Sequence, residues 1–504
     1  MGRISEVGRN AWCEEPVRAA GLLIDGEDYY RAFHQAALRA RRSILLSGWQ
    51  FDSDAKLLCG EEAKRSTAPI KLLELLNTLC KERPELQVKI LAWDFHLVFA
   101  LEREWMQELV FEWTTNERLH YKFDSTHVEG GSHHQKFVVV DGQLSFLGGL
   151  DLCDHRWDDR RHLDKNPLRV SRGEPHKPFH DVQVYLDSRE IGARLTELFE
   201  CRWLRACKEH ITVVHPDTET FGPDWKLQGA VPIAAKTVSL SRTDPHGSPT
   251  VDEPVREIEA QYREGILSAE RLIYVETQYF SSHAIGEALC QRLRAPGPTL
   301  QVVLVLNMKA ETLKEQIAVG LAQAKNIVDV RAAVEGTPHR LGIYYTVPDS
   351  DGGEPQRATY VHSKVMIVDD RWINVGSANL TNRSLSVDTE LNASFETDGP
   401  GDPLAKSICG VRLGLLSEHL GISGLDCDPE GLVDVLDDRA QRRDGRLRLH
   451  PSPTASERTA LGVVDPQKLP FDPDGAEDQD DRSIFAEGLG RLWRRFISDR
   501  DDNK

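Results

Sequence analysis

Apolar residues follow two patterns along the chain, one typical of amphipathic helices and the other of short buried strands. A helical spacing places Phe33, Ala37 and Ala40 on one face, and residues 40–51 then read as a helix end that runs into a strand. Residues 86–91 form another short apolar strand. Because helices and strands alternate in this way, the pattern predicts an α/β fold with a mixed sheet flanked by helices.

The same pattern occurs twice. Residues 269–280 repeat residues 40–51, 229 positions later (269 against 40), and residues 300–305 repeat the strand at 86–91. Two such units packed about a pseudo-twofold axis would bring equivalent elements face to face. We therefore expect two tandem α/β domains related by a pseudo-twofold.

Changes in composition suggest the domain boundaries. We expect a first domain at residues 10–210 and a second at residues 251–425, joined by a connection at residues 211–250 that is rich in turn and proline residues. Residues 426–504 are expected to form a polar, acidic tail.

The tail contains two distinct segments. Its acidic stretch at residues 472–481 is interpreted as part of a solvated linker without a chemical role. Residues 483–499 place apolar side chains on one helical face, which predicts a C-terminal amphipathic helix. We expect this helix to dock on the protein's own core, with a peripheral membrane contact as the alternative.

Composition and charge exclude several classes of protein. The 504 residues are 40% hydrophobic and 28% charged, as in a globular protein of two or three domains. The net charge of −18 argues against a nucleic-acid partner. No apolar run approaches the ~20 residues of a membrane span, and the N-terminus lacks the apolar core of a secretory signal. The nine cysteines are scattered without a CxxC pair, so we expect reduced thiols, no zinc site and a cytoplasmic location.

Each unit carries a histidine and a lysine two positions apart, with an aspartate seven positions after the histidine. The pairs are His134 with Lys136 and His362 with Lys364. Residues two apart on a strand point to the same face, so each pair should project together. One such pair is usually surface decoration, but two copies with identical spacing indicate a shared site.

The aspartates of the motif lie seven residues after the histidines, an odd number, so on a strand they would point to the opposite face. Asp141 and Asp369 stand where a two-residue hairpin turn is expected, so we predict that they shape turns and do not contact substrate. With turns centred there, cross-strand pairing would place Gly149 opposite His134 and Ser377 opposite His362. Asn379 would lie just beyond. A glycine that permits close approach, a hydroxyl, an amide, an imidazole and an ammonium together suit a phosphate anion.

Two histidines that converge on one phosphodiester can divide the reaction between them. One, neutral, attacks phosphorus and forms a phosphohistidine, and the other, protonated, gives its proton to the leaving alcohol. Lys136 and Lys364 would neutralise the nonbridging oxygens, so we expect no metal or cofactor to be required.

Each histidine also needs a partner on its other ring nitrogen. Asp181 and Glu390 occupy the same place in the two repeats, each next to an apolar strand. We predict that they orient the histidines; the alternative is a strand-end carboxylate in solvent.

The paired HxKxxxxD motifs, with the glycine segments that follow them, resemble the phospholipase D superfamily. Four segments are similar to its eukaryotic-type, phosphatidylcholine-hydrolysing branch, namely residues 133–136, 148–159, 178–182 and 273–280. The resemblance covers roughly residues 20–425. It implies two α/β domains that share one active site at their interface. It also implies cleavage of a glycerophospholipid on the head-group side, giving phosphatidic acid and a free alcohol.

The resemblance further implies roles for individual residues. His134 would be the nucleophile and His362 the general acid. The phosphate would be bound by Lys136, Lys364, Ser377 and Asn379, and the histidines would be held by Asp181 and Glu390.

Three other functions remain as alternatives. The same site could transfer the phosphatidyl group to an alcohol, as in a cardiolipin-synthase-like enzyme, or it could cleave nucleic acid. A catalytically silent lipid-binding protein is the least favoured, because both histidines, both lysines and both acids are present.

Overall fold

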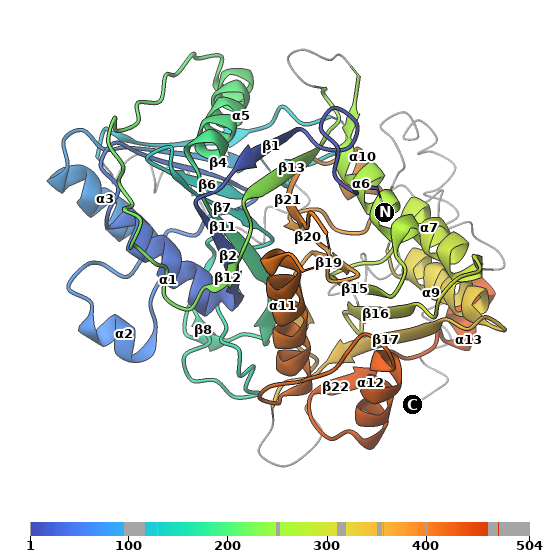
Figure 1. The fold of residues 1–504 in the computed structure, drawn as a ribbon. Helices are drawn as coiled ribbons and strands as arrows, with labels where there is room; N and C mark the ends of the chain where they lie inside the picture. The colour runs from blue at the N-terminus through green and yellow to red at the C-terminus, as the bar shows by residue number, and fades with distance from the viewer. Residues whose placement is uncertain are drawn as a thin grey trace.

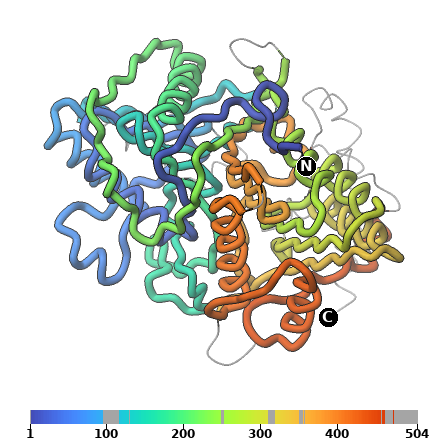
Figure 2. The backbone as a smooth tube through the Cα atoms, viewed as in Figure 1, coloured from blue at the N-terminus to red at the C-terminus, as the bar shows by residue number. Residues whose placement is uncertain are grey.

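The computed structural model describes residues 2–94, 116–128, 130–247, 253–309, 319–349, 355, 357–399, 401–461 and 472. Two large sheets, each flanked by helices, make up most of this part of the chain, as the ribbon in Figure 1 and the backbone tube in Figure 2 show. The predicted α/β fold class is confirmed.

The first sheet belongs to the N-terminal unit. Its spatial order is β12 (Val231–Ile233), β2 (Ala19–Ile24), β11 (Val182–Asp187), β7 (Leu144–Gly148), β6 (Phe137–Val140), β3 (Ser43–Gly48), β4 (Gln87–Trp93) and β5 (Leu119–Asp124). The described helices of this unit are α1 (Asp25–Ala37), α2 (Gly60–Arg65), α3 (Leu72–Glu82), the short 3-10 helix η1 (Asp154–Arg156) and α5 (Arg189–Cys207). A small ribbon pairs β8 (Val170–Ser171) with β9 (Glu174–Pro175).

The second sheet runs in the order β1 (Cys13–Pro16), β13 (Thr237–Asp244), β21 (Glu390–Glu396), β20 (Trp372–Gly376), β19 (Val365–Val368), β15 (Leu272–Thr277), β16 (Gln301–Leu306), β17 (Arg340–Thr346) and β22 (Leu447–Leu449). Strand β14 (Val255–Arg256) pairs with β13. The described helices are α6 (Glu257–Ser268), α7 (His283–Arg294), α9 (Gly320–Val334), α10 (Asn382–Ser386), α11 (Pro403–Leu420), α12 (Leu432–Arg442) and α13 (Ala455–Leu461).

The two sheets repeat one topology. The run β2-β11-β7-β6-β3-β4-β5 corresponds strand by strand to β13-β21-β20-β19-β15-β16-β17. In both runs the last three strands are mutually parallel and the other neighbours are antiparallel. The sequence repeat is therefore a repeat of whole folding units.

The units exchange their edge strands. Strand β1, at the N-terminus, pairs with β13 of the second sheet, whereas β12, which precedes β13 in the chain, pairs with β2 of the first sheet. Each unit thus covers an edge of the other, which protects backbone groups that would otherwise be open to pairing.

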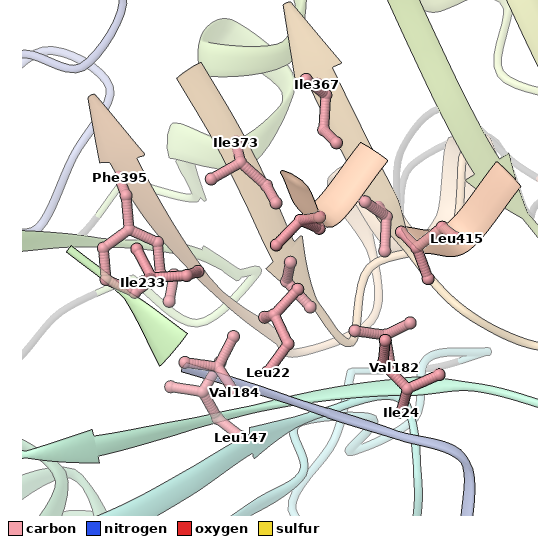
Figure 3. Close-up of a cluster of buried hydrophobic side chains, with 14 of the residues drawn as sticks. Leu22, Ile24, Leu147, Val182, Val184, Ile233, Ile367, Ile373, Phe395 and Leu415 are labelled. Carbon is pink, nitrogen blue, oxygen red and sulfur yellow. The ribbon is translucent and has the colours of Figure 1, made fainter. Parts of the chain in front are cut away.

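A continuous apolar cluster lies between the two sheets. Figure 3 shows Leu22, Val182 and Val184 of the first sheet facing Ile373 and Phe395 of the second. Helices α5 and α11, which follow equivalent strands, add their apolar faces to this cluster. Separate clusters bury the outer sheet faces under α1 and α3 in one unit and under α6, α7 and α9 in the other. This shared core holds the units in fixed register.

The segments expected to be a connection and a tail contain regular structure. Strands β12 and β13 lie within residues 211–250, and α12 and β22 pack on the second unit, where Leu432 and Leu436 are fully buried. The acidic stretch is not wholly solvated, because Asp472 is buried and accepts hydrogen bonds from the Arg383 backbone N–H and the Ser281 hydroxyl. The predicted helix at 483–499 lies outside the described residues. Among the described helices, none has both the length and the apolar composition needed to cross a bilayer.

The hairpins of the two motifs differ from the predicted register by one residue. In the first hairpin the Gln143 N–H closes the predicted two-residue turn on the Val140 carbonyl, with Asp141 and Gly142 both at positive φ. The ladder then pairs Val140 with Leu144 and Phe137 with Leu147, which is one residue off the prediction. Gln143 is therefore an extra residue after the turn, and its backbone carbonyl accepts from the Ser188 N–H outside the hairpin. The second hairpin has the same shift, and there the Arg371 carbonyl accepts from the Thr397 N–H. Gly149 and Ser377 are therefore not directly opposite His134 and His362.

Candidate active site

The His-x-Lys segments stand immediately before equivalent strands. His134 and Lys136 precede β6, and His362 and Lys364 precede β19; all four side chains are buried. Each lysine ammonium donates to the backbone carbonyl of its own histidine, at 3.1 Å for Lys136. Both residues of each pair were expected on a strand, whereas they lie just before it, and each lysine still reaches the backbone of its own histidine.

Each histidine contacts the acid of the opposite unit. The Nδ1 of His134 lies 3.0 Å from both carboxylate oxygens of Glu390, and the Nδ1 of His362 lies 2.6 Å from Oδ2 of Asp181. Both acids are fully buried. With Nδ1 held in this way, the Nε2 atoms remain for chemistry at the interface between the units.

Two short parallel pairings make this crosswise arrangement. Strand β10 (Phe179–His180), just before Asp181, pairs with β18 (Tyr360–Val361), just before His362. At the equivalent place an isolated bridge joins His133 to Thr389, next to His134 and Glu390. Each pairing sets a histidine beside an acid from far along the chain.

The two glycine segments support the acids. A Cβ atom on Gly149 would lie 2.4 Å from Oδ1 of Asp181, so glycine is needed here for the close approach of this carboxylate. At the corresponding position Ser377 donates to Oε2 of Glu390 at 2.5 Å. The predicted phosphate contacts of Gly149 and Ser377 stay predictions, because both residues contact the acids in this structure.

Asn379 is nearly buried, and its carbonyl Oδ1 makes no hydrogen bond to the described residues. Its repeat counterpart is Asp151, for which no role was predicted. The Oδ2 of Asp151 lies 3.5 Å from the Lys136 ammonium. The alignment of Gly148-Gly149-Leu150-Asp151 with Gly376-Ser377-Ala378-Asn379 was the signal that could have identified it.

Two further side chains at the site had no predicted role. The Arg156 Nη1 lies 3.4 Å from the Nε2 of His362, and the Trp49 ring meets the His134 ring edge-on at 4.9 Å between centroids. The Lys136 ammonium lies 5.4 Å from the Trp49 ring centroid. Trp49 lies in the repeated residues 40–51 and Arg156 in residues 148–159, which resemble the family, but neither has a counterpart of the same type in the other unit.

Burial and mutual repulsion shift the ionisation of the site. Burial and the neighbouring lysines lower the pKa of both His134 and His362 well below its ordinary value. Burial also lowers the pKa of Lys364 to about 7. It raises the pKa of Glu390 to about 8 and that of Asp181 to about 6. An anion that enters this site would favour the protonated imidazoles and lysines, and would itself be bound more tightly.

Behind Asp181 lies a buried network of histidines and acids. The donor atoms of Asp25, His162, His180 and Glu418 lie within 4.8 Å of one another, and His180 also joins Glu276 and His419. These are the described residues whose side chains could hold a metal ion. The acids raise the pKa of His162 to about 10, so the protonated imidazole pairs with them in the absence of a metal. The expectation that no metal is required stays a prediction.

Comparison with protein families and relatives identifies matching domains. The family model described as "Cardiolipin synthase, PLD-like domain" matches residues 262–406. Phospholipase D alpha 1 of Ricinus communis is 25% identical over an alignment that covers 84% of this chain and 68% of that protein. Phospholipase D alpha 3 of Arabidopsis thaliana is 23% identical over 77% of this chain and 62% of that protein. The chain thus spans about two thirds of the length of these relatives.

Among solved structures, phosphatidylserine synthase of Haemophilus influenzae Rd KW20 superposes with a TM-score of 0.50. The match covers 88% of this chain and 95% of that chain at 14% sequence identity. At this identity the likeness concerns the fold, and it extends over both units.

Proposed function

The chain belongs to the phospholipase D superfamily, and on this premise we propose that it is a phosphodiesterase that cleaves a glycerophospholipid on the head-group side. The products would be phosphatidic acid and a free alcohol. The observation that carries the proposal is the crosswise pairing of His134 with Glu390 and of His362 with Asp181, which leaves two Nε2 atoms for one substrate.

The reaction begins with attack of the His134 Nε2 lone pair on phosphorus. A phosphorus–nitrogen bond forms as the bond to the head-group oxygen breaks, and that oxygen takes the proton from Nε2 of His362. The attack requires the ionised form of Glu390, whose carboxylate accepts from the Nδ1–H of His134 and stabilises the positive charge that develops on the ring. Lys136 and Lys364 balance the charge on the nonbridging oxygens.

In the second half His362 acts as a base. It takes a proton from water, whose oxygen attacks phosphorus while the phosphorus–nitrogen bond breaks and His134 is restored. An alcohol in place of water would give transfer instead of hydrolysis. The description of the matched family model as a cardiolipin synthase domain supports transfer as the second candidate.

The lowered pKa values set a condition on this mechanism. In the empty site His362 is neutral at pH 7, so it cannot act as an acid until the phosphodiester anion is bound. The negative charge of the bound substrate therefore raises the pKa of His362, so that its imidazole becomes protonated. Burial and the cations Lys136, Lys364 and Arg156 lower the pKa of His134 and His362 alike, so the choice of His134 as the nucleophile rests on the resemblance to the family and is decided by the trapping experiment.

The test is a lipid panel with primary alcohol added, followed by trapping of the covalent intermediate. We expect alcohol release from a phospholipid by the native enzyme, and loss of at least about a thousandfold in His134→Ala and His362→Ala. Mass spectrometry of His362→Ala, incubated with an activated diester and quenched in alkaline denaturant, which preserves a phosphorus–nitrogen bond, should find the phosphoryl group on His134. Wild-type activity in either alanine variant would reject the shared site, and cleavage of single-stranded DNA in place of lipid would reject the substrate class.

A further inference from the structure

Two cations and two aromatic rings of the described residues gather at His362. Arg156 ends helix η1, and Lys177 lies in the loop between β9 and β10. Phe179 and Tyr360 face each other across the short β10–β18 pairing, with ring centroids 5.5 Å apart. Their centroids lie 5.2 and 6.2 Å from that of His362. These residues surround the side of the site from which the head group must leave.

Each of the two aromatic rings already has a cationic side chain of the protein over its face. The Lys177 ammonium lies 3.2 Å from the centroid of the Tyr360 ring, and the Arg156 guanidinium carbon lies 5.6 Å from that of Phe179. Recognition of a quaternary ammonium requires aromatic faces open to the ligand. A choline group at this position would meet two cations instead, so the arrangement disfavours it.

On the corresponding side of the site, at His134, the positive charge of the nearby arginine is neutralised by a carboxylate. There the guanidinium of Arg383 forms a two-point ion pair with Asp388, with nitrogen–oxygen distances of 2.7 and 2.9 Å. Arg156 has no carboxylate within 4 Å among the described residues, and its buried Nε has no hydrogen-bond partner there. On the His362 side, Arg156 therefore keeps a donor that an anionic ligand could accept from.

The contact between Arg156 and His362 cannot persist through the reaction. With Nδ1 of His362 donating to Asp181, Nε2 carries a lone pair and accepts from Arg156 in the empty site. When Nε2 is protonated, Arg156 loses this acceptor and faces a second positive charge. Its fork of N–H groups then needs an anion supplied by the substrate.

We propose that Arg156 and Lys177 form a head-group subsite that selects phospholipids whose head group bears its own carboxylate or phosphate. The proposal rests on the proposed head-group-side cleavage and adds the substrate class. The guanidinium binds the anionic group beside the scissile bond, and the ammonium of Lys177 balances it from the Tyr360 face. A neutral or choline head group gains neither contact.

The experiment compares the full chain with the variants Lys177→Gln and Lys236→Gln. Lys236 is exposed and lies just before β13, so its variant controls for the loss of one positive charge. Turnover is measured on vesicles of phosphatidylserine, phosphatidylinositol 4-phosphate and phosphatidylcholine with matched acyl chains. We expect kcat/KM for at least one anionic head group to exceed that for choline about tenfold or more, which a charge-assisted hydrogen bond can supply. The serine and inositol phosphate arms distinguish a carboxylate from a phosphate ligand.

In Lys177→Gln the preference should fall several-fold, whereas Lys236→Gln should retain it. Arg156→Lys, which keeps the charge but loses the fork, should reduce the preference further. Equal or faster turnover of phosphatidylcholine by the native enzyme would overturn the subsite.

A second measurement separates this proposal from the catalytic one. Calorimetric titration of His134→Ala, which lacks the proposed nucleophile, with glycerophosphoserine, glycerophosphoinositol 4-phosphate and glycerophosphocholine reports binding without turnover; Lys177→Gln is tested in the same background. Tighter binding of an anionic probe that Lys177→Gln removes supports the subsite even if no lipid is cleaved, in which case only the proposed function fails. Turnover combined with tightest binding of glycerophosphocholine leaves the function standing and rejects the subsite.

Discussion

The Nδ1 of His362 and the Oδ2 of Asp181 lie 2.6 Å apart, although they come from different units of the repeat. The contact depends on β10 and β18, whose parallel pairing sets the residues that follow them side by side. Since the equivalent contact joins His134 to Glu390, neither unit alone contains a complete histidine–acid pair. The catalytic centre therefore exists only when both units are folded against each other.

Replacement of either acid should impair catalysis strongly. In Asp181→Asn and Glu390→Gln the amide no longer stabilises an imidazolium and can hold the wrong tautomer, so we expect kcat to fall about a hundredfold or more. Steady-state kinetics on the preferred lipid checks this. Asp434→Asn, an exposed ion-pair partner of Arg340, is the control and should keep native activity. Native kcat in both acid variants would mean that the acids do not orient the histidines.

The alkaline limb of the activity profile should reflect Lys364. Burial lowers the pKa of this ammonium to about 7, so in the free enzyme it loses its proton as pH rises through neutrality. We therefore expect kcat/KM to decline above about pH 7. Lys364→Arg keeps its charge and should move this decline to higher pH, even with a lower maximum. A decline at the same pH in Lys364→Arg would assign it to another group.

The stability of the fold should depend on pH through Glu390. Burial raises the pKa of this carboxyl from 4.5 to about 8, so the folded state binds more protons than the unfolded state between these values. The stabilisation is present below pH 4.5 and is lost as pH rises through 8. Glu390→Gln cannot ionise and should lose less unfolding free energy between pH 5 and 8 than the native chain, by on the order of a few kcal/mol. Denaturant melts at both pH values measure this difference, and an unchanged loss would contradict it.

Gly149 should tolerate no side chain. The Cβ of Gly149→Ala would press on Oδ1 of Asp181 at 2.4 Å and displace the carboxylate from His362. We expect at least a tenfold loss of kcat with about 1–3 kcal/mol lower stability. Gly410→Ala is the matched control, because a Cβ there meets nothing within 4 Å in helix α11, and it should be neutral or stabilising. Equal activity of the two variants would show that Asp181 has room to adjust.

The repeat, the motif residues and the two acids could be predicted from the sequence, because each depends on local pattern and on comparison of one unit with the other. The pairing between the units could not be predicted, since a repeat does not say whether His362 contacts Asp181 or Glu390. The one-residue error in register lies at Gln143, an extra residue after the turn whose carbonyl accepts from Ser188, so the local pattern around the turn could not show it. Arg156 was missed because it has no equivalent of its type in the second unit, so comparison of the repeats could not reveal it.

The aspartate that closes each motif should act on stability and not on chemistry. Asp141 has a φ of 53° and accepts from the backbone N–H groups of Arg41, Arg42 and Ser43 at 2.8–2.9 Å. Asp369 does the same, at a φ of 54°, for the backbone that enters β15. Each carboxylate ties its hairpin turn to the start of a neighbouring strand, and neither contacts the histidines.

Asp141→Asn keeps a residue type that tolerates this conformation but replaces a charged acceptor by an amide. We therefore expect about 2–4 kcal/mol lower stability in denaturant unfolding, with kcat/KM per folded molecule unchanged. The unfolding curve provides the folded fraction, and His134→Ala gives the opposite pattern of native stability without activity. If Asp141→Asn instead kept native stability and lost kcat, the aspartate would belong to the reacting centre, and the separation of scaffold from chemistry within the motif would be wrong.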